Sequence, residues 1–156
     1  MRTAIKFLFV LIISVGMLIG GPSFAEVYVI ENSKDNVPII IDKGEAELPE
    51  IAELNNGACK GFRMNTVYTT VGTGLLAHRI ELDAEGDISD HSGPNIFIAY
   101  IVQGNGLLVN TKDGKKVNEI QYKAGDILVF RPDTMHYWTG GTEKTVMFGV
   151  QQIIPK

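Results

Sequence analysis

Apolar and β-branched residues from Phe62 onward occur in short runs that turn residues separate. The predicted strands are residues 62–71, 75–82, 96–102, 107–110, 117–122, 127–130, 136–139 and 146–151. Glu85-Gly86-Asp87 is expected to turn the chain after the second strand, and Lys112-Asp113-Gly114 is typical of a tight hairpin. At least eight short strands, without a long amphipathic helix, predict an all-β sandwich or a closed antiparallel barrel.

The segment before these strands, residues 26–57, carries weaker signals. Residues 27–30 and 37–41 are short apolar runs with strand character, and a polar turn separates them. Residues 48–54 are expected to form a helical turn, which Asn55-Asn56-Gly57 would end. We therefore predict an N-terminal arm at 26–57, which either covers the barrel or pairs with a second subunit.

The first 25 residues have the three-part pattern of a secretory signal peptide. Arg2 and Lys6 supply a positive start, residues 7–19 are uninterrupted by charge, and Ser23-Phe24-Ala25 offers small residues for cleavage before Glu26. A membrane anchor is the alternative, but this run is shorter than the roughly 20 residues that a spanning helix needs. The pattern predicts an exported protein, periplasmic or secreted, without a stable membrane span after cleavage.

The charge of the chain excludes one class of partner. Removing Arg2 and Lys6 with the signal leaves 12 basic residues against 18 acidic ones, a formal charge of −6. Binding to a phosphate backbone needs clustered Lys and Arg, so we do not expect a nucleic-acid partner. Cys59 is the single cysteine and cannot form a disulfide within the chain, so the core must hold the fold together.

Two glycine-bounded stretches carry the candidate chemistry: residues 86–106, which contain His91 and end in Tyr100-Ile101-Val102-Gln103-Gly104, and residues 125–136, which begin with Gly125-Asp126 and end at His136. Together they resemble the two sequence motifs of the cupin superfamily, and the resemblance covers roughly half of the chain. It implies a cupin-type antiparallel β-barrel, jelly-roll-like, over residues 58–156, preceded by the N-terminal arm.

In that family, two histidines and a glutamate of the first motif and one histidine of the second bind a metal. The resemblance therefore implies a site for Zn, Fe, Ni or Mn. Here His91 and His136 match the first and last ligands, whereas Gly93 stands at the second histidine. The glutamate position holds Phe97, or Ile96 if the loop is counted one residue shorter. The second motif also has Arg131-Pro132-Asp133 where Pro-x-Gly is usual. Two histidines alone would make a weak, exchangeable metal site.

A third ligand would have to come from a neighbouring residue. Asn95 could offer an amide oxygen, Asp90 a carboxylate, and His78 an imidazole. By strand alternation His78 lies on an apolar face with Ile80, which favours a buried, hydrogen-bonded histidine over a ligand. The alternative for His91 and His136 is that they are hydrogen-bonding groups in a pocket without metal.

The aromatic residues near the histidines suggest the character of such a pocket. By alternation Phe97, Ala99 and Ile101 share one face of their strand, and Trp138 shares the face of His136. Phe97 and Trp138 would then give the cavity aromatic walls, although plain core packing explains both residues equally well. An apolar or ring-bearing small molecule, held by a few polar groups, suits such a lining.

Three hypotheses on function follow. The first is an exported protein that binds a small, partly apolar molecule in a pocket lined by His78, His91, Asn95, Phe97, His136 and Trp138. The second is a metal-dependent enzyme of the dioxygenase, isomerase or lyase kind, with the metal on His91 and His136. The third is a structural module that forms a homodimer through the arm and the faces of the sheet. The fold alone does not decide between them.

Overall fold

The computed structural model describes residues 24–69 and 74–153, and every regular element in these ranges is a β-strand. The strands are β1 (Phe24–Asn32), β2 (Pro38–Glu47), β3 (Glu53–Leu54), β4 (Gly57–Ala58), β5 (Lys60–Thr69), β6 (Leu75–His91), β7 (Ile96–Gln103), β8 (Asn105–Lys112), β9 (Lys115–Lys123), β10 (Ile127–Phe130), β11 (His136–Gly140) and β12 (Thr145–Gln152). In the described part of the chain, no helix is long and apolar enough to cross a membrane.

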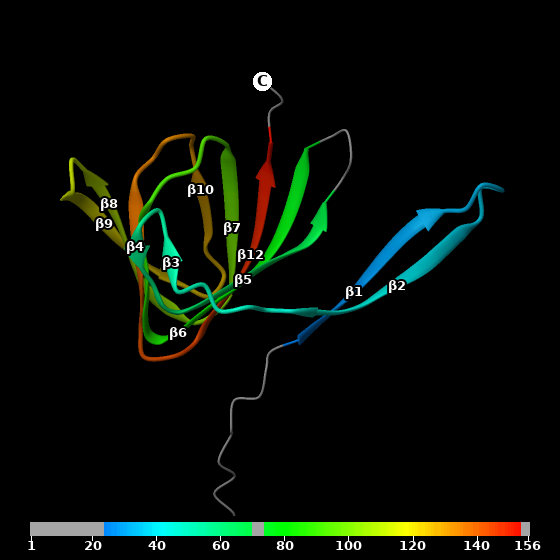
Figure 1. Ribbon diagram of the computed structural model, residues 1–156, viewed down its shortest axis with the longest axis horizontal. Helices are drawn as coiled ribbons and strands as arrows, with labels where there is room; N and C mark the ends of the chain where they lie inside the picture. Colours follow the sequence, from blue (N-terminus) through cyan, green and yellow to red (C-terminus); the bar gives the residue numbers. More distant parts are fainter. Residues whose placement is uncertain (1–23, 70–73, 154–156) are drawn as a thin grey trace, which may run out of the picture.

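One large sheet forms the body of the protein. Its strands follow the order β10-β7-β12-β6-β11-β8-β9, with β5 added on β6, and every pairing is antiparallel. The sheet curls into the half-barrel seen in Figure 1, which confirms the predicted all-β, jelly-roll-like barrel with an N-terminal arm. Strand β6 pairs with β5 and β12 along its first part and with β11 at its end, so it belongs to both walls of the barrel.

The core fills the concave side of this curled sheet. Along β7, Ala99 and Ile101 are buried and Phe97 is half-buried, whereas Ile98 and Tyr100 are exposed. This confirms the alternation that the sequence predicted. The buried apolar side chains of the main cluster are Phe62, Ile80, Leu82, Ile88, Ala99, Ile101, Leu108, Tyr122, Phe130, Trp138 and Met147.

The turn predicted at Glu85-Gly86-Asp87 is wrong, because β6 continues through it to His91. Glu85 adopts a left-handed conformation with φ of 55°, and its amide donates to the carbonyl of Gly141 at 3.0 Å. A Cβ at Gly86 would lie 2.7 Å from the carbonyl oxygen of Lys60, so a neighbouring backbone packs directly against this glycine. The three residues bend a continuous strand and leave its direction unreversed.

The helical turn predicted over residues 48–54 is also wrong. The amide of Ile51 donates to the carbonyl of Phe62 at 2.8 Å, and Glu50 forms an isolated antiparallel bridge with Arg63. The segment is therefore held extended along β5, and this long-range pairing overrides the local preference for a helix. Asn55 and Asn56, which were expected to end that helical turn, instead connect β3 to β4.

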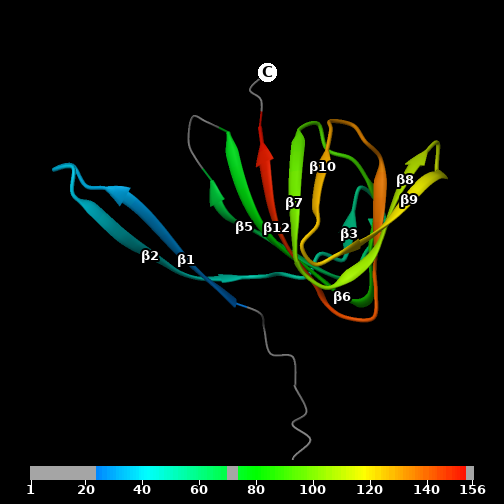
Figure 2. The same ribbon diagram turned by 180° about the vertical axis from the view of Figure 1, so that it is seen from behind.

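Strands β1 and β2 form the hairpin of the arm, which projects away from the barrel in Figures 1 and 2. The predicted runs 27–30 and 37–41 fall in these strands, apart from Val37, which precedes β2. The predicted signal peptide lies largely outside the described residues, and β1 begins at Phe24, so it runs across the predicted cleavage site. The division of the chain into signal, arm and barrel remains a prediction.

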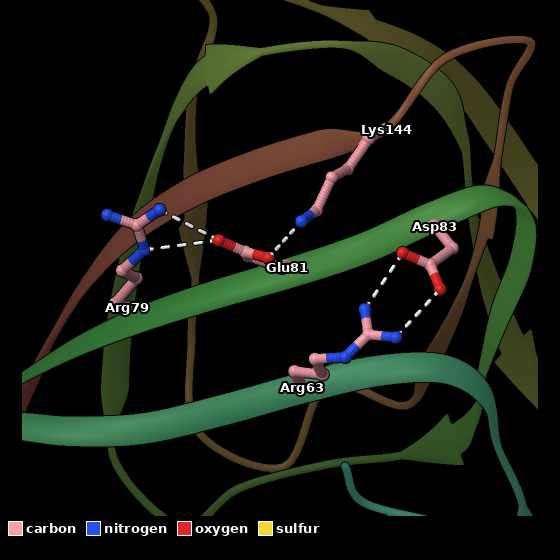
Figure 3. A network of polar contacts seen from close by, with 5 residues as sticks. All are labelled: Arg63, Arg79, Glu81, Asp83 and Lys144. Atoms are coloured by element: carbon pink, nitrogen blue, oxygen red, sulfur yellow. Dashed lines mark hydrogen bonds and ion pairs between the residues drawn. The ribbon is translucent and has the colours of Figure 1, made fainter. Parts of the chain in front are cut away.

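A network of ions ties three strands together on the convex side of β6 (Figure 3). Glu81 is only 1% exposed, and its Oε1 accepts hydrogen bonds from Nε and Nη2 of Arg79 at 3.2 and 2.8 Å. Its Oε2 pairs with Nζ of Lys144, the residue before β12. Next to it, Arg63 of β5 binds Asp83 with two hydrogen bonds of 2.8 and 3.0 Å. These two hydrogen bonds lower the pKa of Asp83 and raise the pKa of Arg63.

Candidate functional site

Two imidazole rings meet on the concave side of the sheet. His91 is the last residue of β6 and His136 the first of β11, and the two residues are direct partners in the antiparallel register. Their ring centroids lie 4.4 Å apart with an angle of 54° between the planes. The structure thus brings the two rings together, as the sequence predicted.

Each ring is held by the same local hydrogen bond. Nδ1 of His91 lies 2.7 Å from the carbonyl oxygen of Ser89, and Nδ1 of His136 lies 2.8 Å from that of Thr134. In both cases the carbonyl belongs to the residue two positions earlier in the chain. The orientation of each imidazole is therefore fixed by its own backbone and needs no side-chain partner.

Burial keeps both histidines neutral near pH 7. Desolvation is the largest influence on His136 and lowers its pKa to about 4; the bond to Thr134 opposes this shift, and the neighbouring His91 adds to it. Desolvation likewise lowers the pKa of His91, against the smaller opposing influence of the Ser89 carbonyl. The pair therefore acts as two uncharged imidazoles, which can accept hydrogen bonds but carry no positive charge.

The two rings open onto a cavity of about 250 Å³ inside the barrel. Phe130 stacks on His136 with ring centroids 4.3 Å apart, and Trp138 contacts the same ring edge-on at 6.2 Å. Phe97 continues the aromatic wall, 6.0 Å from Phe130. The residues that line the cavity are Leu54, Phe62, Met64, His78, Ile80, Ile88, His91, Ser92, Gly93, Asn95, Phe97, Phe130, Arg131, Thr134, His136, Trp138, Met147 and Gln151.

This set includes every residue that the sequence predicted for the pocket. Those six residues are His78, His91, Asn95, Phe97, His136 and Trp138. Asp90 is absent from the lining, and both of its carboxylate oxygens accept a hydrogen bond from the hydroxyl of Thr111 at 2.8 Å. The structure therefore supports the location of the predicted pocket, while its role in binding a ligand remains a prediction.

His78 is a buried, hydrogen-bonded histidine in the wall of the cavity. Its side chain is 5% exposed, and its Nδ1 lies 3.1 Å from the hydroxyl of Thr66 on the neighbouring strand. Burial lowers the pKa of His78, and a hydrogen bond with Gln151 partly offsets that shift. Its ring centroid lies 6.1 Å from that of Phe97. These contacts favour the structural interpretation of His78 over a role as a replacement metal ligand.

The residues at the site do not fit a resident transition metal. Within residues 24–69 and 74–153, no three His, Cys, Asp or Glu side chains lie close enough together to bind one ion. His78 and Asp90 therefore do not complete a site with the histidine pair in these ranges, so the alternative in which one of them supplies a third ligand is not supported. Asn95 lines the cavity, but one amide oxygen beside two imidazoles is a weak set for Zn, Fe, Ni or Mn.

Several lining residues were missed by sequence reasoning. Phe130 was placed in a strand, but its contact with His136 depends on the pairing of β10 with β7. Gln151 lies opposite Phe97 in the register of β12 and β7, and Arg131 lies at the turn that follows β10. Alternation could have placed Phe130 on the inner face; the positions of Gln151 and Arg131 follow only from the assembled barrel.

Comparison with known proteins gives structural relatives only. No protein-family model matches the chain, and no curated protein matches its sequence. The cupin domain of Schizosaccharomyces pombe Cnp3 is similar with a TM-score of 0.58 at 11% identity, over 83% of this chain and 88% of that one. A putative ethanolamine utilization protein Q from Salmonella typhimurium has a TM-score of 0.56 at 12% identity, over 83% and 97%. KdgF from Halomonas sp. has a TM-score of 0.50 at 21% identity, over 61% and 82%.

Proposed function

We propose that this chain, which has the cupin fold, binds a small and partly apolar molecule in its barrel without the help of a metal ion. The cavity around His91 and His136 carries the proposal, because it combines aromatic walls with two uncharged polar groups. Ligand sites are typically apolar cavities with a few placed polar groups and volumes of roughly 300–1,000 Å³. A cavity of about 250 Å³ suits a ligand smaller than most drugs.

The single tryptophan of the chain provides a direct assay. Trp138 is 3% exposed and lines the cavity, so a ligand that enters should change its fluorescence. We expect toluene and phenol to change this signal in a saturable manner. The substitution Ile80→Phe adds bulk to the cavity wall and should abolish the change, whereas Val117→Phe adds comparable bulk to the exposed strand β9 and should preserve it. Equal titrations of the two variants would refute the proposal.

The metal-dependent enzyme is the alternative in the same cavity, and elemental analysis distinguishes the two. We expect a metal content near zero after reconstitution with Zn, Fe, Ni or Mn, because two imidazoles lack a strong third ligand. A stoichiometric metal that is lost in His136→Ala would favour the enzyme. The predicted signal peptide at residues 1–25 supports a location outside the cytoplasm, which fractionation of cells that express the full chain would test.

A second candidate function is self-association through the convex face of the sheet. The registers place Ile127, Tyr100 and Phe148 in one row across β10, β7 and β12, with exposures of 66%, 45% and 44%. The next row holds Val129 and Ile98, at 62% and 41%. A contiguous apolar patch of this kind marks an interaction surface.

The arm extends this apolar surface. A groove of about 590 Å³ lies between β1 and the convex face, lined by residues that include Tyr28, Tyr68 and Phe148. Ile30 and Ile40 on the hairpin are 74% and 71% exposed, and an isolated two-stranded hairpin is at best marginally stable. We propose that a second copy of the chain covers both surfaces.

Light scattering after size-exclusion chromatography tests this second proposal. We expect the wild-type chain to elute as a dimer and Tyr100→Asp as a monomer, because the substitution places a charge in the middle of the apolar row. Ile120→Asp, at an exposed site on β9, is the matched control and should remain dimeric. A monomeric wild-type chain at micromolar concentration would contradict the proposal.

A further inference from the structure

We infer that the ligand is an uncharged, mostly apolar molecule about the size of one aromatic ring, with a hydroxyl or N–H donor that binds Nε2 of His91 or of His136. The inference rests on the proposed function, since it concerns the ligand of the same cavity. Three points support this inference: the positions of the protons on the two imidazoles, the access of Nε2 to the cavity, and the exclusion of charged ligands by apolar walls.

The backbone contacts determine the proton positions. A carbonyl oxygen can only accept a hydrogen bond, so Nδ1 of His91 must carry the proton that it donates to Ser89. The same reasoning places a proton on Nδ1 of His136, which donates to Thr134. A neutral imidazole carries one N–H, so Nε2 of each ring has a lone pair and no proton.

Both Nε2 atoms face a space where a ligand can reach them. Within residues 24–69 and 74–153 no hydrogen bond reaches either Nε2 atom, and neither is a fully buried polar atom. A water molecule can therefore contact each Nε2 atom, although the side chain of His136 is only 6% exposed. Since both residues line the cavity, that space is the cavity itself.

Two neighbouring acceptors select the polar group of the ligand. A ligand that brought only an acceptor would force a ring to move its proton to Nε2, and the carbonyl of Ser89 or Thr134 would lose its donor. An anion would also meet two lone pairs and the nearby carboxylate of Asp90, with no positive charge on the rings. Arg131 lines the cavity but is exposed, so its charge is available to solvent at the rim.

The walls determine the rest of the ligand. Phe97, Phe130 and Trp138 surround the pair with aromatic surface, and Met147 adds a buried thioether. Such a lining excludes full charges, because an ion without a partner is costly to transfer into an apolar environment. Phenol is therefore the simplest probe of the inferred ligand class, and toluene is nearly its isostere without the donor.

The experiment compares the affinities of phenol and toluene by Trp138 fluorescence at pH 7.5. The measured quantity is the affinity for phenol divided by the affinity for toluene. A substitution that only changes the shape of the cavity affects both ligands alike, so a change in this ratio reports on the hydroxyl of phenol. A hydrogen bond with a net value of roughly 1 kcal/mol corresponds to about a five-fold change in affinity. We therefore expect the ratio to fall about three- to ten-fold in at least one of His136→Phe and His91→Phe, because the single hydroxyl proton of phenol donates to one acceptor.

The outcomes separate this inference from the proposed function. If toluene and phenol both bind and the ratio is the same in the wild type and both variants, the cavity binds ligands but the donor inference is wrong. If benzoate binds more tightly than phenol to the wild type, the ligand class is anionic and the inference is again wrong. If neither toluene nor phenol binds at millimolar concentration, the proposed function fails with it. His91→Phe provides a second test should His136→Phe not fold.

Discussion

The buried His136 should make the protein sensitive to mild acid in a way that one substitution removes. Its ring is 6% exposed, stacked on Phe130, and has a pKa near 4 in the folded chain, against 6.5 for an unperturbed histidine. Unfolding exposes the ring to water, where it takes up a proton more readily. The contribution of His136 to the free energy of unfolding is therefore complete above pH 6.5 and is lost as the pH falls toward 4.

The size of this contribution follows from the two pKa values. Between pH 7.5 and pH 4.5, the preferential protonation of the unfolded state should lower the free energy of unfolding by about 2.5 kcal/mol. Acidic groups with a lowered pKa, such as Asp83, also stabilise the fold less as the pH falls, which lowers the free energy of unfolding. Their contribution is common to the wild type and to a variant at position 136, so the difference between the two isolates the histidine.

Urea unfolding followed by circular dichroism at pH 7.5, 6.0 and 4.5 provides the measurement. His136→Phe replaces the ring with one that cannot titrate, and its free energy of unfolding should fall less than that of the wild type by about 2.5 kcal/mol over this range. Lys116→Gln, at an exposed site on β9, should follow the wild type. If the wild type and His136→Phe lose stability in parallel, His136 is not a buried neutral group and the reasoning is refuted.

Two further substitutions test the packing of the site and the ion network. At Gly149 an added Cβ would lie 2.4 Å from Cζ of Phe97, so Gly149→Ala should push that ring into the cavity, weaken toluene binding and cost about 1–3 kcal/mol of stability. Unchanged toluene affinity would contradict this. Glu81→Gln should destabilise the fold by about 1–3 kcal/mol in urea, because it leaves two cationic partners without their buried carboxylate. Glu119→Gln, in an exposed pair, should cost less than about 0.5 kcal/mol, and equal losses would argue against the network.

Those parts of the fold and site that depend on strand periodicity could be predicted from the sequence. Inward-facing residues on a strand recur at every second position, so the shared face of Phe97, Ala99 and Ile101 follows from the pattern alone. The meeting of His91 and His136 was predicted from the resemblance of two motifs, and the register of β6 and β11 explains it physically.

The parts that failed depend on long-range pairing. Glu85-Gly86-Asp87 has the composition of a turn, but the sequence does not show that Gly141 accepts a hydrogen bond from the strand at that point. Residues 48–54 have no partner in a local analysis, and β5 supplies one in the barrel. The ion pairs of Glu81 likewise require β6 and the residue before β12 to be neighbours, which local patterns do not contain.

The orientation of the two imidazole rings does not depend on the side chains that shape the rest of the cavity. Because Ser89 and Thr134 orient the rings through main-chain carbonyls, no wall side chain is needed to aim Nε2. Substitutions at Phe97, Met64 or Gln151 could therefore change which molecule fits while the two acceptors keep their direction. If the cavity binds a ligand as proposed, its selectivity could change through substitutions in the wall while the two acceptors stay in place.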